Sequence, residues 1–120
     1  MFIRDLSKTA KFAAGDNSVL KELFNPNKDK LKINYSLALA KVKPGQSTKK
    51  HSLKSSEVYF ILKGQGLMTI DNEQAEVKEG QAIYIPPNAS QCIKNTGQTG
   101  LEFLCIVEPA WKPEDENVLE

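Results

Sequence analysis

The chain has 120 residues, the size of one domain, with 40% hydrophobic and 26% charged residues, 16 Lys and Arg against 15 Asp and Glu, and one histidine, His51. A chain of this length buries roughly two-thirds of its unfolded surface, so one core can form without disulfides or a structural metal. The balanced charge argues against a nucleic-acid binder, and a single imidazole excludes zinc fingers and sites with three histidines.

The N-terminal residues 1–32 are expected to form an arm that packs on the main domain. Residues 1–16 lack the continuous apolar segment of a signal peptide, and no apolar stretch in the chain is long enough for a transmembrane helix. We therefore expect a cytoplasmic protein that does not bind membranes. Within the arm, the segment from Ser18 to Phe24 is compatible with either a short helix or a strand. We favour an edge strand or an irregular arm.

Short apolar runs follow from Ile33 onward, separated by Gly, Pro and Asx residues suited to tight turns. The runs are Ile33 to Val42, Lys50 to Leu53, Glu57 to Lys63, Leu67 to Asp71, Gln74 to Lys78, Ala82 to Ile85, Ser90 to Asn95 and Leu101 to Val107. No long window there keeps a helical period without a breaker. The pattern predicts an all-β domain over residues 33–108 and argues against a parallel α/β architecture.

Several runs indicate which faces are buried. Residues 33–42 alternate between a face of large apolar side chains and a face of small or polar ones, so one face is core. Val58 to Leu62 and Phe103 to Val107 are continuously apolar, which suits strands covered on both sides. Gly64 and Gly66 are expected to form a hairpin. Residues 109–120 contain Pro113 and several acidic groups and are expected to form a loosely packed acidic tail.

Two segments carry a spacing pattern that bears on function. The first has Gly45, five residues, His51, one residue, Leu53, three residues, Glu57, six residues and Gly64. The second has Gly80, five residues, Pro86-Pro87-Asn88, two residues, Gln91, three residues and Asn95. These spacings resemble the two motifs of the cupin superfamily: a glycine, five residues, His-x-His, three or four residues, a glutamate, six residues and a glycine, followed by a glycine, five residues, Pro-x-Gly, two residues, a histidine, three residues and an asparagine.

The resemblance implies a double-stranded β-helix, or jelly-roll, barrel with an N-terminal arm, and a metal site in the barrel. In cupins the metal ligands are the two histidines and the glutamate of the first motif and the histidine of the second. Here His51 and Glu57 are retained, whereas Leu53 and Gln91 replace the other two histidines. Asn88 replaces a glycine, which is tolerable because asparagine also adopts left-handed conformations.

The residues themselves leave two interpretations of this site open. His51, Glu57 and the amide oxygen of Gln91 could hold a divalent cation, whose identity as Fe, Mn, Ni or Zn the sequence does not distinguish, more weakly than a complete ligand set. Alternatively, the same three residues form a metal-free polar cluster, because buried polar groups must find hydrogen-bond partners. Tyr59 and Tyr84 could line a cofactor or ligand cavity or could be core residues.

The leading hypothesis is a small single-domain cupin that binds a small organic ligand, anionic or oxygenated, with or without a divalent metal. Glu57 or His51 would act as general base in oxygenase, isomerase or lyase chemistry. The alternative is a non-catalytic binding or sensor module, so the sequence leaves open whether the protein is an enzyme. Because single-domain cupins commonly pair through their N-terminal strands, the resemblance and the apolar residues of the arm predict a homodimer.

Overall fold

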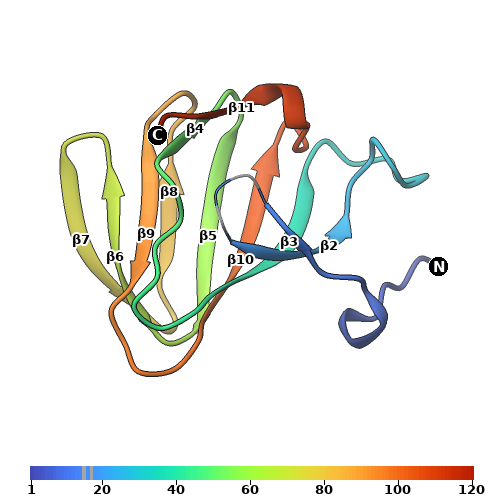
Figure 1. Ribbon diagram of the computed structural model, residues 1–120. Coiled ribbons are helices and arrows are strands. Elements are labelled where there is room, and N and C mark those ends of the chain that lie inside the picture. Colours follow the sequence, from blue (N-terminus) through green and yellow to red (C-terminus); the bar gives the residue numbers. More distant parts are fainter. Residues whose placement is uncertain (15, 17) are drawn as a thin grey trace.

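The fold is described from a computed structural model that places residues 1–14, 16 and 18–120. In these residues the chain folds into two antiparallel sheets that face each other (Figure 1). The six-stranded sheet has the order β1-β2-β3-β10-β5-β8, and the five-stranded sheet has the order β11-β4-β9-β6-β7. This arrangement confirms the all-β prediction and matches a jelly-roll barrel.

The strands are β1 (Phe12–Ala13), β2 (Val19–Phe24), β3 (Ser36–Val42), β4 (His51–Leu53), β5 (Ser56–Lys63), β6 (Gln65–Ile70), β7 (Glu73–Lys78), β8 (Ala82–Ile85), β9 (Gln91–Asn95), β10 (Leu101–Glu108) and β11 (Glu116–Val118). Two short 3₁₀ turns, η1 (Leu6–Lys8) and η2 (Pro113–Asp115), complete the described elements. Each apolar run predicted from Ile33 onward overlaps one strand, and their ends agree to within three residues, because most turn residues between the runs interrupt the extended backbone. Asn88 has a φ of 67°, the left-handed conformation expected of it.

The hydrophobic core lies between the two sheets and is built mainly from alternate residues of β3, β5 and β10. Its fully buried members include Ile61, Ile93 and Phe103. In β3 it is the small face that points inward: Ser36, Ala38 and Ala40 line the interior, which leaves room for a cavity. The small side chains of β3 therefore determine how much space remains inside the barrel.

The prediction that β5 and β10 are covered on both sides was wrong. Phe60 and Leu62 are 37% and 42% exposed, and Ile106 is 37% exposed. These side chains point away from the barrel interior, because successive residues of a strand face opposite sides of the sheet. An unbroken apolar run therefore marks only one buried face here.

The N-terminal arm extends the six-stranded sheet. β2 pairs with β3, as the strand interpretation of Ser18 to Phe24 predicted, but β1 pairs with the far side of β2 and takes the edge. The ring of Phe2 packs against that of Phe24 at a centroid distance of 5.6 Å. The division of the chain at residues 32 and 108 stays a prediction.

The C-terminal tail is not loosely packed. β11 pairs with β4, with Glu116 opposite Leu53 and Val118 opposite His51, and lies at the end of the barrel beside β4 (Figure 1). Further backbone hydrogen bonds anchor it, including one of 3.1 Å from the Lys54 N–H to the Asp115 carbonyl. The acidic composition predicted a solvated tail, but the backbone N–H and C=O groups of β4 pair with those of the tail.

The glycines after β5 mark a change of sheet and not a hairpin. β5 belongs to the six-stranded sheet and β6 to the five-stranded one. Gly64 sits at the crossing with a φ of +90°, and a side chain at this position would approach the Gly100 carbonyl at 3.0 Å. The prediction of a hairpin was wrong because a local glycine signal does not tell which sheet the next strand joins. Within the described residues, no helix has the length and apolarity needed to cross a membrane.

Candidate functional site

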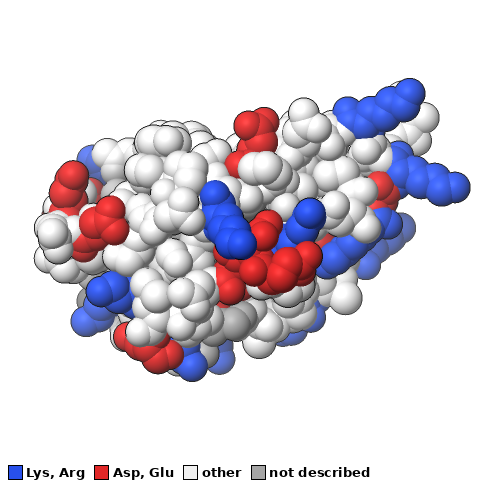
Figure 2. Space-filling view, turned by 90° about the horizontal axis from the view of Figure 1, so that it is seen from above, with Lys and Arg blue, Asp and Glu red and all other residues white. Residues whose placement is uncertain are grey.

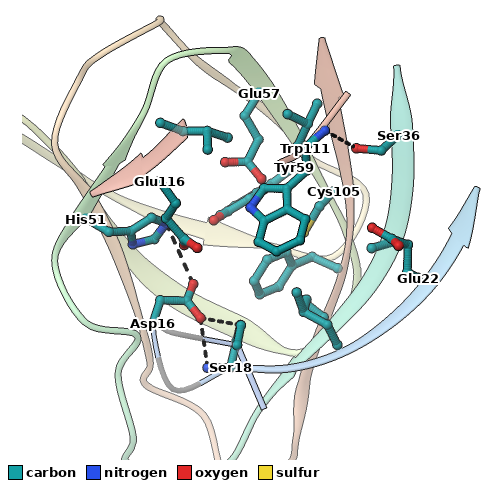
Figure 3. Close-up of a pocket in the computed structure, with 17 residues that line it drawn as sticks. Asp16, Ser18, Glu22, Ser36, His51, Glu57, Tyr59, Cys105, Trp111 and Glu116 are labelled. Carbon is teal, nitrogen blue, oxygen red and sulfur yellow. Dashed lines mark hydrogen bonds and ion pairs between the residues drawn. The ribbon is translucent and has the colours of Figure 1, made fainter. Parts of the chain in front are cut away.

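A cavity opens between the two sheets at the end of the barrel where β4 and β11 lie (Figure 3). Its volume, about 50 Å³ for water-sized molecules, is several times the roughly 10–15 Å³ that one ordered water needs. The arm, the barrel strands and the tail all contribute to its wall. The polar or titratable lining residues are Asp16, Ser18, Glu22, Ser36, His51, Glu57, Tyr59, Cys105, Trp111 and Glu116.

One wall of the cavity is a hydrogen-bonded chain of three buried side chains. The Tyr59 hydroxyl donates to Oε1 of Gln91 at 2.9 Å, and Nε2 of Gln91 donates to Oε1 of Glu57 at 3.1 Å. Gln91 is 1% exposed and lies behind the cavity wall. Both ends of its amide are therefore occupied in fixing the positions of Glu57 and Tyr59.

Glu57 is the acidic residue of this hydrogen-bonded chain, and its buried environment favours the neutral form of its carboxyl group. Burial raises its pKa from 4.5 to about 8; the hydrogen bond from Gln91 acts in the opposite direction, and the negative charges of Asp16 and Glu116 raise the pKa further. At pH 7 Glu57 therefore carries a proton inside the cavity and can donate it in a hydrogen bond. The same burial raises the pKa of Tyr59 well above its ordinary value, so its hydroxyl stays protonated too.

His51 occupies the opposite wall and is almost completely buried. Its Nδ1 lies 2.8 Å from the carbonyl oxygen of Lys49. Because a carbonyl oxygen can only accept, this nitrogen carries the proton of the contact. The other ring nitrogen, Nε2, points into the cavity and lies 3.7 Å from Oδ2 of Asp16 (Figure 3).

Asp16 comes from the arm and is held in place by its neighbours. Its Oδ1 accepts hydrogen bonds from the backbone N–H and the hydroxyl of Ser18, at 3.0 and 2.6 Å. The backbone N–H of Lys49 donates to the Asp16 carbonyl at 2.6 Å, so the same residue anchors both Asp16 and His51. Oδ2 of Asp16 is thereby directed toward the imidazole.

Glu116 reaches the same point from the tail. The pairing of β11 with β4 places it opposite Leu53, two positions from His51. Figure 3 shows the three side chains of Asp16, His51 and Glu116 pointing toward one another. Burial raises the pKa of Glu116, the histidine lowers it, and the charge of Asp16 raises it again. The site thus combines one imidazole with two converging carboxyl groups.

The cavity is acidic. Among the described residues that line it, four are carboxylic acids (Asp16, Glu22, Glu57 and Glu116) and none is a lysine or an arginine. Seen from this end of the barrel, acidic side chains gather near the middle of the molecule with basic side chains beside them (Figure 2). These acids disfavour the entry of an anion that brings no cation or proton with it.

The structure brings together most of the residues that were predicted from the sequence to form the site. His51, Glu57 and Tyr59 line the cavity, and Leu53 lies on the same face as His51, as the period of two predicts. Gln91 is a register partner of His51 but touches Glu57 and Tyr59 from behind. Tyr84 lies on the outside of β8, 63% exposed and away from the cavity.

Two residues of the site, Asp16 and Glu116, were missed. Neither belongs to a motif, and both lie outside the predicted β domain of residues 33–108. An acidic residue two positions before a serine in the arm and an acid among other acids in the tail are ordinary surface patterns. Only the pairing of the arm and the tail with the barrel gives them a common location.

The comparisons with known proteins agree with this architecture. Residues 38–107 match the family model of the cupin domain. Protein MJ1618 of Methanocaldococcus jannaschii is 42% identical over 117 residues, which cover 97% of this chain and 93% of that protein. An oxalate-binding protein of Thermotoga maritima is 34% identical over 71 residues, which cover 58% of this chain and 59% of that protein.

A solved structure extends the likeness to three dimensions. The crystal structure of a predicted oxalate decarboxylase from Thermotoga maritima superposes with a TM-score of 0.78 at 24% identity, covering 91% of this chain and 99% of that one. At this identity the likeness concerns the fold. Together with the family model, which spans more than half of the residues, it shows that the chain belongs to the cupin family.

Proposed function

We propose that this protein binds a small oxygen-rich organic ligand, of the carboxylate class, in the barrel cavity beside Glu57. The observation that carries this proposal is the buried Glu57, whose pKa of about 8 keeps a proton facing a small cavity at neutral pH. A neutral carboxyl group can donate a hydrogen bond to a ligand carboxylate where an ionised one would repel it. The oxalate-binding relative supports this ligand class.

A divalent cation is part of this proposal, because the acidic wall disfavours an anion by itself. The sequence-derived ligand set of His51, Glu57 and Gln91 stays a prediction. With a cation polarising the ligand, Glu57 or His51 would give or take a proton, which is the requirement of isomerase or lyase chemistry. The cavity admits only a ligand of a few heavy atoms, which favours compact acids over large substrates.

A metal-free binding or sensor module is the second candidate. It is favoured by the hydrogen-bonded chain of Tyr59, Gln91 and Glu57, which satisfies its members without a metal. Among the described residues, no buried side-chain nitrogen or oxygen lacks a hydrogen-bond partner. In this alternative the ligand enters with its own proton, as a neutral acid or a neutral polar molecule.

Isothermal titration with oxalate and malonate, with and without Mn²⁺, tests the proposal. Ala38 lines the cavity, so Ala38→Leu fills it, and we expect ligand affinity to fall by at least about tenfold. Ala82→Leu, the same change at an exposed position of β8, is the matched control and should bind as the unaltered protein does.

The titration separates the two candidates. Binding that requires Mn²⁺ supports the cation-assisted carboxylate site, and binding without it supports the metal-free module. Failure of both acids to bind under either condition would contradict the proposed ligand class. Binding that survives Ala38→Leu would show that the ligand sits elsewhere.

We also propose that the protein is a homodimer paired through the N-terminal arm. Phe2 and Ile3 are adjacent large apolar side chains of the arm and are 42% and 78% exposed, so a partner could cover them together. Light scattering should give twice the 13.3 kDa mass of the chain, and Ile3→Glu should shift the mass toward that of the monomer. Leu119→Glu, at an exposed position of the tail, is the control that should leave the mass unchanged.

A further inference from the structure

We propose that Asp16, His51 and Glu116 form a divalent-cation site that the barrel shares with its two terminal segments. Of these three residues, only His51 occupies a position that holds a metal ligand in the cupin motifs. The proposal deepens the cation-assisted function above, but it concerns metal binding by the protein alone and can be tested without any organic ligand.

The geometry suits one ion. One ligand atom from each of the three residues lies within 4.8 Å of the others. Ligands at about 2.1 Å from a tetrahedral ion are roughly 3.4 Å apart, so a small inward movement of the two carboxylates would complete the contacts. Among the described residues, this is the group of histidine, cysteine and acidic side chains whose ligand atoms converge in this way.

The orientation of His51 is the second observation. Its Nδ1 donates to the Lys49 carbonyl, so in the neutral ring the lone pair of Nε2 points at the carboxylates of Asp16 and Glu116. A lone pair facing two anions is unfavourable unless a cation lies between them. Either a proton, carried by the ring or by one of the two carboxyl groups, or a metal ion removes this repulsion. A second ring nitrogen bonded to a backbone carbonyl is the usual arrangement of a metal-ligating histidine.

The carboxylates are arranged for the same purpose. Ser18 occupies Oδ1 of Asp16 and leaves Oδ2 directed at the imidazole. Asp16 and Glu116 together carry two negative charges when ionised, which one divalent ion neutralises. The repulsion between the two carboxylates would be relieved by such an ion.

The family positions are less suited to hold the cation. Leu53 offers no donor atom, and the amide of Gln91 is already bonded at both ends. Glu57 is buried, and its Oε1 already accepts a hydrogen bond from Gln91. One imidazole with two carboxylates instead suits Mn²⁺, Fe²⁺ or Zn²⁺ and leaves coordination positions for water or a ligand carboxylate in the cavity.

A cation at this point would join three separate parts of the chain. Asp16 belongs to the arm, His51 to β4 and Glu116 to the tail strand β11 (Figure 3). Metal binding should therefore raise the melting temperature and slow hydrogen exchange in both terminal segments. A site held only by barrel residues would leave the arm and the tail unchanged.

The test is titration of the chelator-treated protein with Mn²⁺, followed by electron paramagnetic resonance, and with Zn²⁺, followed by calorimetry. We expect one ion per chain. Asp16→Asn and Glu116→Gln should each weaken binding at least about tenfold, because even residues behind a metal ligand cost 10- to 100-fold when changed. Glu114→Gln, which removes the same charge from an exposed position of the tail, and Glu57→Gln should change affinity less than about threefold.

The outcomes decide the assignment. Loss of binding in Glu57→Gln with none in Asp16→Asn and Glu116→Gln would overturn the proposal and support the sequence-derived set. Absence of saturable binding by either ion would also overturn it. Because Asp16→Asn could disturb the arm, the metal-free melting temperature of each variant is measured, and the Glu116→Gln result stands independently. A metal site that forms while oxalate and malonate fail to bind would sustain this proposal and refute the proposed ligand.

Discussion

Replacing Glu57 by glutamine is expected to remove a large pH dependence of stability. The folded protein holds the Glu57 proton up to a pH of about 8, whereas the unfolded chain loses it near 4.5. Between these values only the folded state binds the proton, so the free energy of unfolding falls as pH rises. The slope is about 1.4 kcal/mol per pH unit, and the whole effect is at most about 5 kcal/mol.

The measurement is urea unfolding between pH 5 and pH 9 in the presence of a chelator. Stability due to neutral Glu57 is complete below pH 4.5 and is lost as the pH passes through 8, so the curve should level off above that point. Glu57→Gln keeps the shape and the hydrogen-bonding capacity of the side chain but cannot ionise. The difference between the two curves isolates Glu57 from Asp16 and Glu116, which face the same cavity.

Glu114→Gln is the matched control, because it removes an acid from an exposed position. Its curve should run parallel to that of the unaltered protein. Parallel curves for Glu57→Gln and the unaltered protein would contradict the prediction and mean that Glu57 ionises in the folded state. The same result would remove the main support for the proposed carboxylate ligand.

Restoring the two missing imidazoles with Leu53→His and Gln91→His is expected to increase metal affinity greatly. Leu53 faces the cavity beside His51, and position 91 lies opposite His51 across the β4 and β9 pairing. The double substitution would therefore add two strong donors near His51 and free Glu57 from its amide partner. We expect affinity for Mn²⁺ or Zn²⁺ to rise by about a hundredfold or more.

Proton release provides an independent measure of this gain. Glu57 holds a proton at pH 7 and must lose it to bind a metal ion, so binding to the double variant should release close to one additional proton. Titrations in buffers of different ionisation enthalpy would detect it. Leu53→Gln is the control, because it adds a side chain of similar size with only a weak donor. Unchanged affinity in the double variant would show that positions 53 and 91 do not face a common ion.

The sequence determined the strand pattern of the barrel and part of its site. Ala82 to Ile85 forms a strand with the predicted bounds, because alternation and turn residues act through near neighbours in the chain. His51, Leu53 and Glu57 line one cavity for the same local reason: two are on one strand at a spacing of two, and the third is near the start of the next strand.

The tertiary structure decided what local patterns cannot express. The partner of β11 is a strand more than 60 positions earlier in the sequence, and the composition of the tail gave no indication of it. The convergence of Asp16 and Glu116 on His51 likewise depends on two chain ends meeting at one end of the barrel. Burial, which sets the proton on Glu57, is also a property of the assembled barrel. The sequence thus identified the fold and the surviving histidine, and the packing of the termini determined which acids surround it.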